Sequence, residues 1–167
     1  SLTYARALEG ISMLDEVNLP QLSLEERDRR YKLVREKMAA RGLDCLVMPH
    51  NTGDWDSNQT YVRYLTGTSG HCTGAAAVFP IDGEPIPMVR DPQRLEWWKR
   101  AKTWVKKTRA RDGLWSDTLV QAIRDVGHDG GKIGVIGLQD MRRNPEGTVS
   151  YNEWVHIKEQ LVDAQFE

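Results

Sequence analysis

The sequence has little cysteine, no long apolar run and no excess of either charge, and each shortage excludes a class of protein. The two cysteines, Cys45 and Cys72, are too few for a disulfide framework in a chain of 167 residues. We therefore expect a reducing compartment, the cytoplasm. No apolar run approaches the roughly 20 residues that a membrane-spanning helix needs. The first residues also lack the basic and apolar segments of a secretory signal.

The charges nearly cancel, which removes the electrostatic basis for nucleic-acid binding. Lys and Arg total 23 and Asp and Glu total 24, for a net charge of -1. One cluster of arginines occurs, but acidic residues interrupt it, and we interpret it as the solvated face of a helix. Its members are Arg27, Arg29 and Arg30, interleaved with Glu25, Glu26 and Asp28. The length and the 40% hydrophobic content suit one globular domain with its own core.

The first strongly patterned segment predicts a helix over residues 23–41. Ser23 and Glu26 have the spacing of a capping box, in which each side chain bonds a free backbone N–H. Gly42 suits the left-handed residue that follows a helix. Residues 1–22 show only weak periodicity, and we expect them to form a peripheral arm before a domain that spans residues 23–167.

The rest of the chain alternates between strand and helix patterns. The expected strands are residues 43–48, 75–79, 86–90, 104–108 and 132–137, with a last strand near residue 164. The expected helices begin at Asp91-Pro92, at Ser116 or Asp117, and at Ser150, where Glu153 completes a second capping box. This alternation predicts an α/β domain. A hairpin around Asp82-Gly83 adds an antiparallel pair, so the sheet should be mixed.

Several side chains could carry chemistry, but none has the spacing of a known site. Residues 134–137 read Gly-Val-Ile-Gly without the full dinucleotide fingerprint, so we interpret them as glycines of a close-packed strand. No Gly-x-Ser-x-Gly motif appears, although a Ser/His/Asp triad that assembles only in space stays open. Metal-ligand atoms occur at His50, Asp54, Asp56, His71 and Cys72, without a metal-binding pattern.

A tryptophan in a polar loop is a further candidate. Trp55 stands between Asp54 and Asp56, where an aromatic ring either recognises a ligand or covers the end of the sheet. Both readings stay open. Cys72 follows His71 directly, but neighbours in sequence do not have the geometry of a nucleophile and its base.

The segment Tyr61-Val62-Arg63-Tyr64-Leu65-Thr66-Gly67 lies between the first strand and the hairpin. This order resembles the N-terminal domain of the creatinase/prolidase/aminopeptidase P family. The matching pieces are the opening helix, Gly42 to Val47, Tyr64-Leu65-Thr66-Gly67, the hairpin, the helix from Ser116, Lys132 to Val135 and the closing helix. The resemblance covers about residues 23–167. It implies an α/β fold with a mixed β-sheet flanked by helices on both faces, in a ribonuclease-H-like arrangement.

The resemblance implies that this chain is a non-catalytic domain of a Xaa-Pro peptidase that assists oligomerisation and substrate access. Family members carry a divalent metal pair (Mn, Co, Zn or Fe) in a C-terminal domain, which would be this domain's own partner. They form dimers or tetramers in which the N-terminal domain approaches the neighbouring active site. We therefore expect no catalytic residue or metal ligand here. Substrate contacts across the subunit interface are expected from His71, Trp55 and Asp54.

Two departures from the family pattern leave the substrate open. Thr68 stands where many members have an aromatic residue, and residues 50–59 are longer and more acidic than a simple peptidase needs. Together with Val78-Phe79-Pro80, that segment is similar to prolidase-fold lyases that act on dimethylsulfoniopropionate. A Xaa-Pro peptide, a creatine-like molecule and a sulfonium zwitterion therefore remain as candidates. A standalone interaction module also remains, as does a small enzyme with a site of its own among His50, Asp54 and His71.

Overall fold

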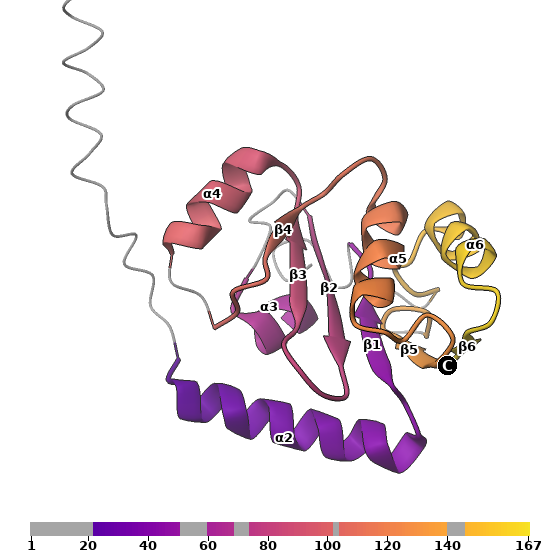
Figure 1. The fold of residues 1–167 in the computed structure, drawn as a ribbon, viewed down its shortest axis with the longest axis horizontal. Coiled ribbons are helices and arrows are strands. Elements are labelled where there is room, and N and C mark those ends of the chain that lie inside the picture. Colours follow the sequence, from indigo (N-terminus) through magenta and orange to yellow (C-terminus); the bar gives the residue numbers. More distant parts are fainter. Residues whose placement is uncertain (1–21, 51–59, 69–73, 102–103, 140–145) are drawn as a thin grey trace, which may run out of the picture.

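Six strands form one mixed sheet in the computed structural model, which describes residues 22–50, 60–68, 74–101, 104–139 and 146–167. They are β1 (Cys45–Met48), β2 (Ala75–Pro80), β3 (Ile86–Val89), β4 (Arg109–Ala110), β5 (Lys132–Val135) and β6 (Gln165–Phe166). Their order across the sheet is β4-β3-β2-β1-β5-β6 (Figure 1). β2 runs antiparallel to both of its neighbours, and the other neighbouring pairs are parallel. The predicted α/β fold with a mixed sheet is therefore confirmed.

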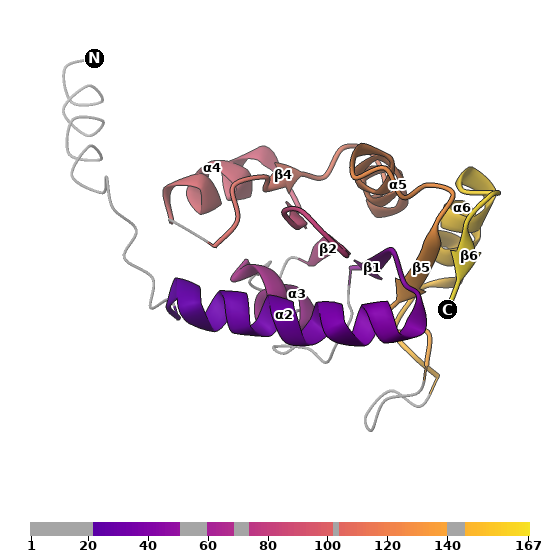
Figure 2. The same cartoon turned by 60° about the horizontal axis from the view of Figure 1, so that its bottom comes forward.

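Helices cover both faces of this sheet (Figure 2). One face carries α2 (Leu24–Arg41) and α3 (Thr60–Thr66). The other carries α5 (Trp115–Asp125) and α6 (Tyr151–Gln160). α4 (Pro92–Arg100) packs through Trp98 on Val89 of β3, which pairs with Ala75 and therefore lies on the same face as α2 and α3. None of the helices in the described parts of the chain is long and apolar enough to span a bilayer.

The central strands are buried on both faces, and alternate side chains enter two separate cores. In β1, Cys45 and Val47 pack with α5 and α6, whereas Met48 packs with α2 and α3. All six residues of β2 are buried in the same alternating way. A strand covered on both faces reads as a continuous apolar run, which is why these segments show no polar alternation. Burial also raises the pKa of the Cys45 thiol to about 12, so this side chain behaves as a small apolar group.

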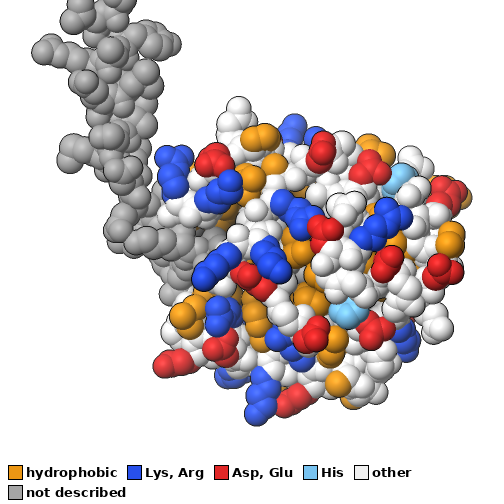
Figure 3. Space-filling model, viewed as in Figure 1, with side chains coloured by type: hydrophobic (Ala, Val, Ile, Leu, Met, Phe, Trp, Pro, Cys, Tyr) orange, Lys and Arg blue, Asp and Glu red, His pale blue; other side chains and the backbone are white. Residues whose placement is uncertain are grey.

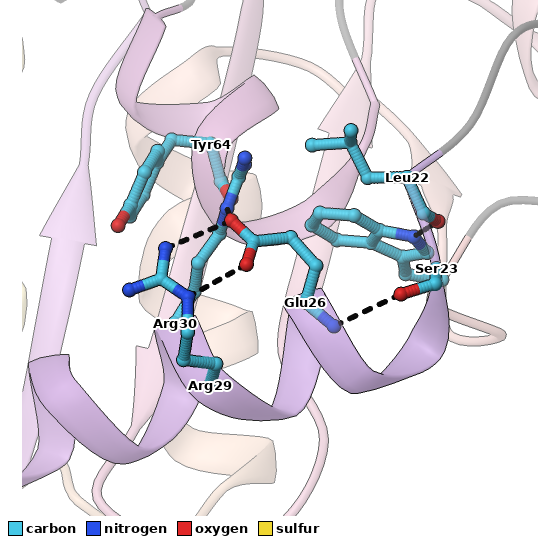
Figure 4. A network of polar contacts seen from close by, with 7 residues as sticks. Leu22, Ser23, Glu26, Arg29, Arg30 and Tyr64 are labelled. Carbon is cyan, nitrogen blue, oxygen red and sulfur yellow. Dashed lines mark hydrogen bonds and ion pairs between the residues drawn. The ribbon is translucent and has the colours of Figure 1, made fainter.

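Only half of each predicted capping box forms. The Ser23 hydroxyl accepts a hydrogen bond from the Glu26 backbone N–H at 3.2 Å, as expected. The Glu26 carboxylate turns instead to Arg29 and Arg30, at 2.6 and 2.8 Å (Figure 4). These guanidinium groups lower the pKa of Glu26 to about 2. The arginine cluster is thus paired within its own helix. On the face shown in Figure 3, Lys and Arg side chains are likewise interspersed with Asp and Glu.

Two predicted elements lie elsewhere in the structure. The strand expected over residues 104–108 is wrong, because the edge strand β4 is Arg109–Ala110. Trp104 instead donates its indole N–H to the Leu22 carbonyl at 2.9 Å. The predicted start of α5 is also displaced. The N-cap is Leu114, whose backbone N–H donates to the Asp117 carboxylate at 3.2 Å.

Gly134 is a close-packed glycine of β5, as the sequence suggests. A Cβ atom at this position would lie 2.7 Å from Leu46 Cδ2 and 3.0 Å from Leu43 Cδ1. The first contact is shorter than two carbon atoms approach in real structures and the second is tight, so both leucine side chains would have to move to admit a Cβ. The glycine therefore serves packing between β1 and β5.

We predict that Gly134→Ala lowers the free energy of unfolding by about 1–3 kcal/mol, the usual range for overpacking a core. Gly130→Ala is the matched control, since a Cβ there would meet only Asp163 Cβ, at an ordinary 3.9 Å. The control should change stability by less than about 0.5 kcal/mol. Urea denaturation of both variants measures the difference. Equal losses at the two positions would contradict the packing role of Gly134.

Candidate functional site

The structure describes the flanks of the segments that carry the predicted contact residues. Asp54, Trp55 and His71 lie outside the described residues, as do Asp56 and Cys72. His50 directly precedes one of these segments and Gly74 directly follows the other. The antiparallel pairing of β1 with β2 brings these two positions to the same edge of the sheet, because Met48 lies opposite Ala77.

This edge is where an open α/β sheet usually binds its ligands. The parallel strands β1 and β5 end here side by side. After β1 the chain returns through β2 on one side, whereas after β5 it continues through α6 to β6 on the other. Such a change of direction between neighbouring parallel strands is a topological switch point, and ligands bind outside the carboxyl ends of strands there. Helices α5 and α6 also begin at this edge, because each leads back to a parallel strand.

His50 is held at the switch point by two other elements. Its Nδ1 atom lies 2.8 Å from Oε2 of Glu153, in the first turn of α6. Its ring stacks on Trp115, the first residue of α5, with 5.4 Å between centroids and 8° between planes. The side chain of Glu153 is only 5% exposed and that of His50 is 25% exposed. A mostly buried carboxylate thus faces a partly accessible imidazole.

Glu153 lies at a helix start whose cap does not use its carboxylate. Its backbone N–H donates to the Ser150 hydroxyl at 3.3 Å, so the helix is capped without help from the carboxylate. The positive end of the helix dipole stabilises a negative charge in the first turn. One carboxylate oxygen, Oε1, is buried and has no hydrogen-bond partner among the described residues. The hydroxyl oxygen of Thr148, just before the helix, is in the same state.

Gly74 completes the group, which we call the His50 cluster: His50, Gly74, Trp115 and Glu153. Gly74 has a φ of +82°, and a Cβ there would lie 3.4 Å from Trp115 Cζ2 and 3.9 Å from His50 Cδ2. These are ordinary van der Waals distances, so the positive φ rather than a lack of room is what favours glycine here. The guanidinium of Arg111 lies 5.6 Å from the centroid of the Trp115 ring.

Sequence reasoning found His50 but missed its partners. Glu153 fits a capping box with Ser150, which is a sufficient local explanation for it. The hydrogen bond to His50 spans 103 positions in the chain, and no local pattern reports such a contact. Trp115 stands where the sequence suggested a residue before the helix. The sequence offered one signal for this site: a polar segment follows β1 and another precedes β2, at the same end of the two paired strands.

The Tyr64-Leu65-Thr66-Gly67 motif has a structural role. Leu65 is 3% exposed in the core under α3. Thr66 is fully buried, and its hydroxyl donates to the Val62 carbonyl at 2.7 Å and accepts from the Thr68 backbone N–H at 3.1 Å. Gly67 then turns the chain with a φ of +68°, against the ring of Trp104. The motif therefore ends α3 and docks Trp104.

Tyr64 contributes the outer part of this docking. The Arg30 guanidinium lies 4.3 Å from the Tyr64 ring centroid and 5.2 Å from that of Trp104, and it donates to the Tyr64 carbonyl at 3.0 Å (Figure 4). One arginine of α2 thus joins α3 to the segment before β4. Among the described residues, no group of three or more His, Cys, Asp or Glu side chains is placed to hold a metal ion.

The comparisons with known proteins agree with this architecture. The family model described as the Creatinase/Prolidase N-terminal domain matches residues 30–165. The chain belongs to this family. No curated protein sequence matches it. Solved structures, however, share its fold at low sequence identity.

Three such structures are peptidases or parts of them. The N-terminal domain of the cytoplasmic peptidase PepQ from Mycobacterium tuberculosis has a TM-score of 0.56 at 16% identity, over 83% of this chain and 91% of that one. A Xaa-Pro dipeptidase from Bacillus anthracis has a TM-score of 0.57 at 16% identity, over 84% of this chain but 32% of that one. A prolidase from Thermococcus sibiricus has a TM-score of 0.56 at 11% sequence identity, over 87% of this chain and 35% of that one. This chain thus spans about a third of the two whole enzymes.

We predict that Thr66→Val lowers the free energy of unfolding by about 1–3 kcal/mol, since it leaves the buried Thr68 N–H without its acceptor. Thr68→Val is a matched control, because the Thr68 hydroxyl oxygen is buried without a partner among the described residues. That substitution should be neutral or stabilising. Thermal and urea unfolding of both variants provide the measurement. If Thr68→Val lowered the free energy of unfolding and Thr66→Val did not, the assigned hydrogen bonds would be wrong.

Proposed function

We propose that this domain is the non-catalytic N-terminal part of a prolidase-like Xaa-Pro peptidase, in which it shapes substrate access and builds the oligomer. The observation that carries the proposal is the extent of the match. The chain aligns with nearly the whole of a PepQ N-terminal domain but only 32% of a Xaa-Pro dipeptidase. A domain of this kind works beside a larger partner on the same polypeptide.

The bond-breaking chemistry would belong to that partner. A pair of divalent ions (Mn, Co, Zn or Fe) bound in a C-terminal domain would supply the Lewis-acid chemistry that activates a water molecule for amide hydrolysis. The described residues of the present domain offer no cluster of ligands for such a pair. The contribution proposed for it is to the walls of the site and to assembly into a cytoplasmic homodimer or tetramer.

The contact residues proposed for this role are His71, Trp55 and Asp54, reaching the active site of a neighbouring subunit. Support comes from the residues that flank them, since His50 and Gly74 lie together at the switch point of the sheet. The segment that follows His50 therefore starts at the place where the segment that precedes Gly74 ends. The polar head of His71 suits a carboxylate or amide of a bound peptide.

A sulfonium substrate receives less support. The resemblance to dimethylsulfoniopropionate lyases includes Val78-Phe79-Pro80, but the structure places all three residues in β2, and all three are buried. They pack the core between two layers of helices and have no surface to offer a ligand. A creatine-like substrate and a standalone interaction module have no described residue in their favour.

The proposal predicts that the 167-residue chain, supplied with Mn²⁺, releases no proline from Xaa-Pro dipeptides. The polypeptide extended through the coding sequence downstream of Glu167 should hydrolyse them. In that longer protein, His71→Ala and Trp55→Ala should raise KM more than they lower kcat, because they remove binding rather than chemistry. Arg63→Ala, on the exposed side of α3, is the control. Proline release by the short chain alone, or a gene that ends at Glu167, would overturn the proposal.

A further inference from the structure

We propose that His50 is a further substrate-contacting residue, whose Nε2 atom accepts a hydrogen bond from the cationic amino end of a ligand. This inference rests on the proposed function and adds a named group and a ligand class to it. It depends on the His50 cluster alone, so it does not involve the segments outside the described residues.

The contact with Glu153 decides the tautomer of the His50 imidazole. An ionised carboxylate has acceptor atoms only, so the hydrogen bond between Glu153 Oε2 and His50 Nδ1 requires the proton on Nδ1. In the neutral ring the other nitrogen, Nε2, then carries a lone pair and accepts hydrogen bonds. Histidines that bind metals or act in catalysis are oriented by a carboxylate in the same way.

Two neighbours hold the His50 ring in this orientation. Trp115 covers one face at an interplanar angle of 8°, and the contact of Nδ1 with Glu153 Oε2 at 2.8 Å holds one edge of the ring. Removing the imidazole would leave the buried carboxylate of Glu153 without its partner, which is costly in a low-dielectric site. The cluster thus presents Nε2 in a fixed direction before a ligand arrives, which lowers the entropic cost of binding.

A second histidine–carboxylate pair shows what an ordinary contact of this type looks like. His156 Nε2 lies 2.7 Å from Asp117 Oδ1, between α6 and α5. The His156 side chain is 29% exposed, close to the 25% of His50, but the Asp117 side chain is 48% exposed, so the carboxylate of this pair is solvated. A solvated pair of this kind contributes little to stability and fixes little. The burial of Glu153 is what distinguishes the His50 cluster.

The charge and the acceptor atoms of the His50 cluster indicate which class of ligand it would bind. With a neutral imidazole the pair carries one negative charge, and Glu153 Oε1 is a buried acceptor without a donor among the described residues. Acceptors with a net negative charge favour a cation that donates hydrogen bonds, and a primary ammonium offers three donors and no acceptor. The free amino end of a Xaa-Pro dipeptide is such a group.

The same cluster disfavours a sulfonium or quaternary ammonium cation. Such cations have no N–H to donate and depend on an open aromatic face. The Trp115 ring already contacts the imidazole of His50 and has the guanidinium of Arg111 over it. The acceptor atoms, rather than the indole, are the part of the cluster that a ligand would use.

The test begins with the tautomer, measured on the 15N-labelled chain by the nitrogen chemical shifts of its histidines. We expect His50 to carry its proton on Nδ1 when neutral. A neutral His50 with the proton on Nε2 would overturn the proposal, because no acceptor would then face the ligand.

The ligand arm uses three probes that separate the two ends of the peptide: glycyl-proline, glycyl-prolinamide and N-acetyl-glycyl-proline. The first two retain the amine and should shift the His50 Nε2 resonance, whereas the acetylated peptide should not. An equal response to the acetylated peptide would mean that the carboxylate is recognised instead. If none of the three peptides shifts the His50 Nε2 resonance up to its solubility limit, the cluster is a structural contact only. Either result contradicts the proposal.

Two variants provide the matched comparison. Glu153→Gln removes the charge and the tautomer preference, and should weaken amine binding about tenfold, the loss of one charge-assisted hydrogen bond. His156→Gln alters the exposed pair and should leave binding unchanged; equal weakening by both would count against the cluster. If Glu153→Gln does not fold, the probes on the unmodified chain still decide. The proposed function is tested by a different measurement, because proline release by the 167-residue chain alone would overturn it without bearing on the binding of amines by His50.

Discussion

Burial of β1 and β2 on both faces is the constraint that decides where polar chemistry can reside in this domain. Every residue of β2 is buried, and β1 is buried at Cys45, Val47 and Met48. No polar side chain fits within such strands without losing its hydrogen bonds to water. Polar groups therefore collect where the strands end. The carboxyl end of β1 is one such place, and the helix starts of α5 and α6 supply the side chains that meet His50 there.

Much of this architecture follows from local patterns in the sequence. Ser23 and Gly42 mark the two ends of α2 correctly, and Asp91 caps α4 through a hydrogen bond from the Arg94 N–H at 2.9 Å. The glycine at position 83 turns the hairpin with a φ of +77°. Each of these signals concerns residues within a few positions of one another, which is the range over which sequence patterns carry physical information.

The predictions from sequence are wrong where contacts between residues distant in the chain override a local pattern. Trp104 and its neighbours alternate as a strand would, but the tryptophan ring fills the space beside Gly67, 37 positions earlier in the numbering, and ends that alternation. Glu26 and Glu153 both fit capping boxes, yet both carboxylates find stronger partners in arginine and histidine. A glutamate with capping-box spacing is thus a candidate site residue when its carboxylate can bond another side chain instead of the helix backbone. Only the three-dimensional structure shows whether such a side chain is near.

The family fold persists at 11–16% identity because packing, rather than particular residues, maintains it. The His50 cluster is different, since its geometry depends on the identity of each member. A double-mutant cycle between His50 and Glu153, with His156 and Asp117 as the reference cycle, tests this central claim most directly. The account predicts a coupling free energy above about 1 kcal/mol for the buried pair and below about 0.5 kcal/mol for the exposed one. Equal coupling in the two pairs would contradict it.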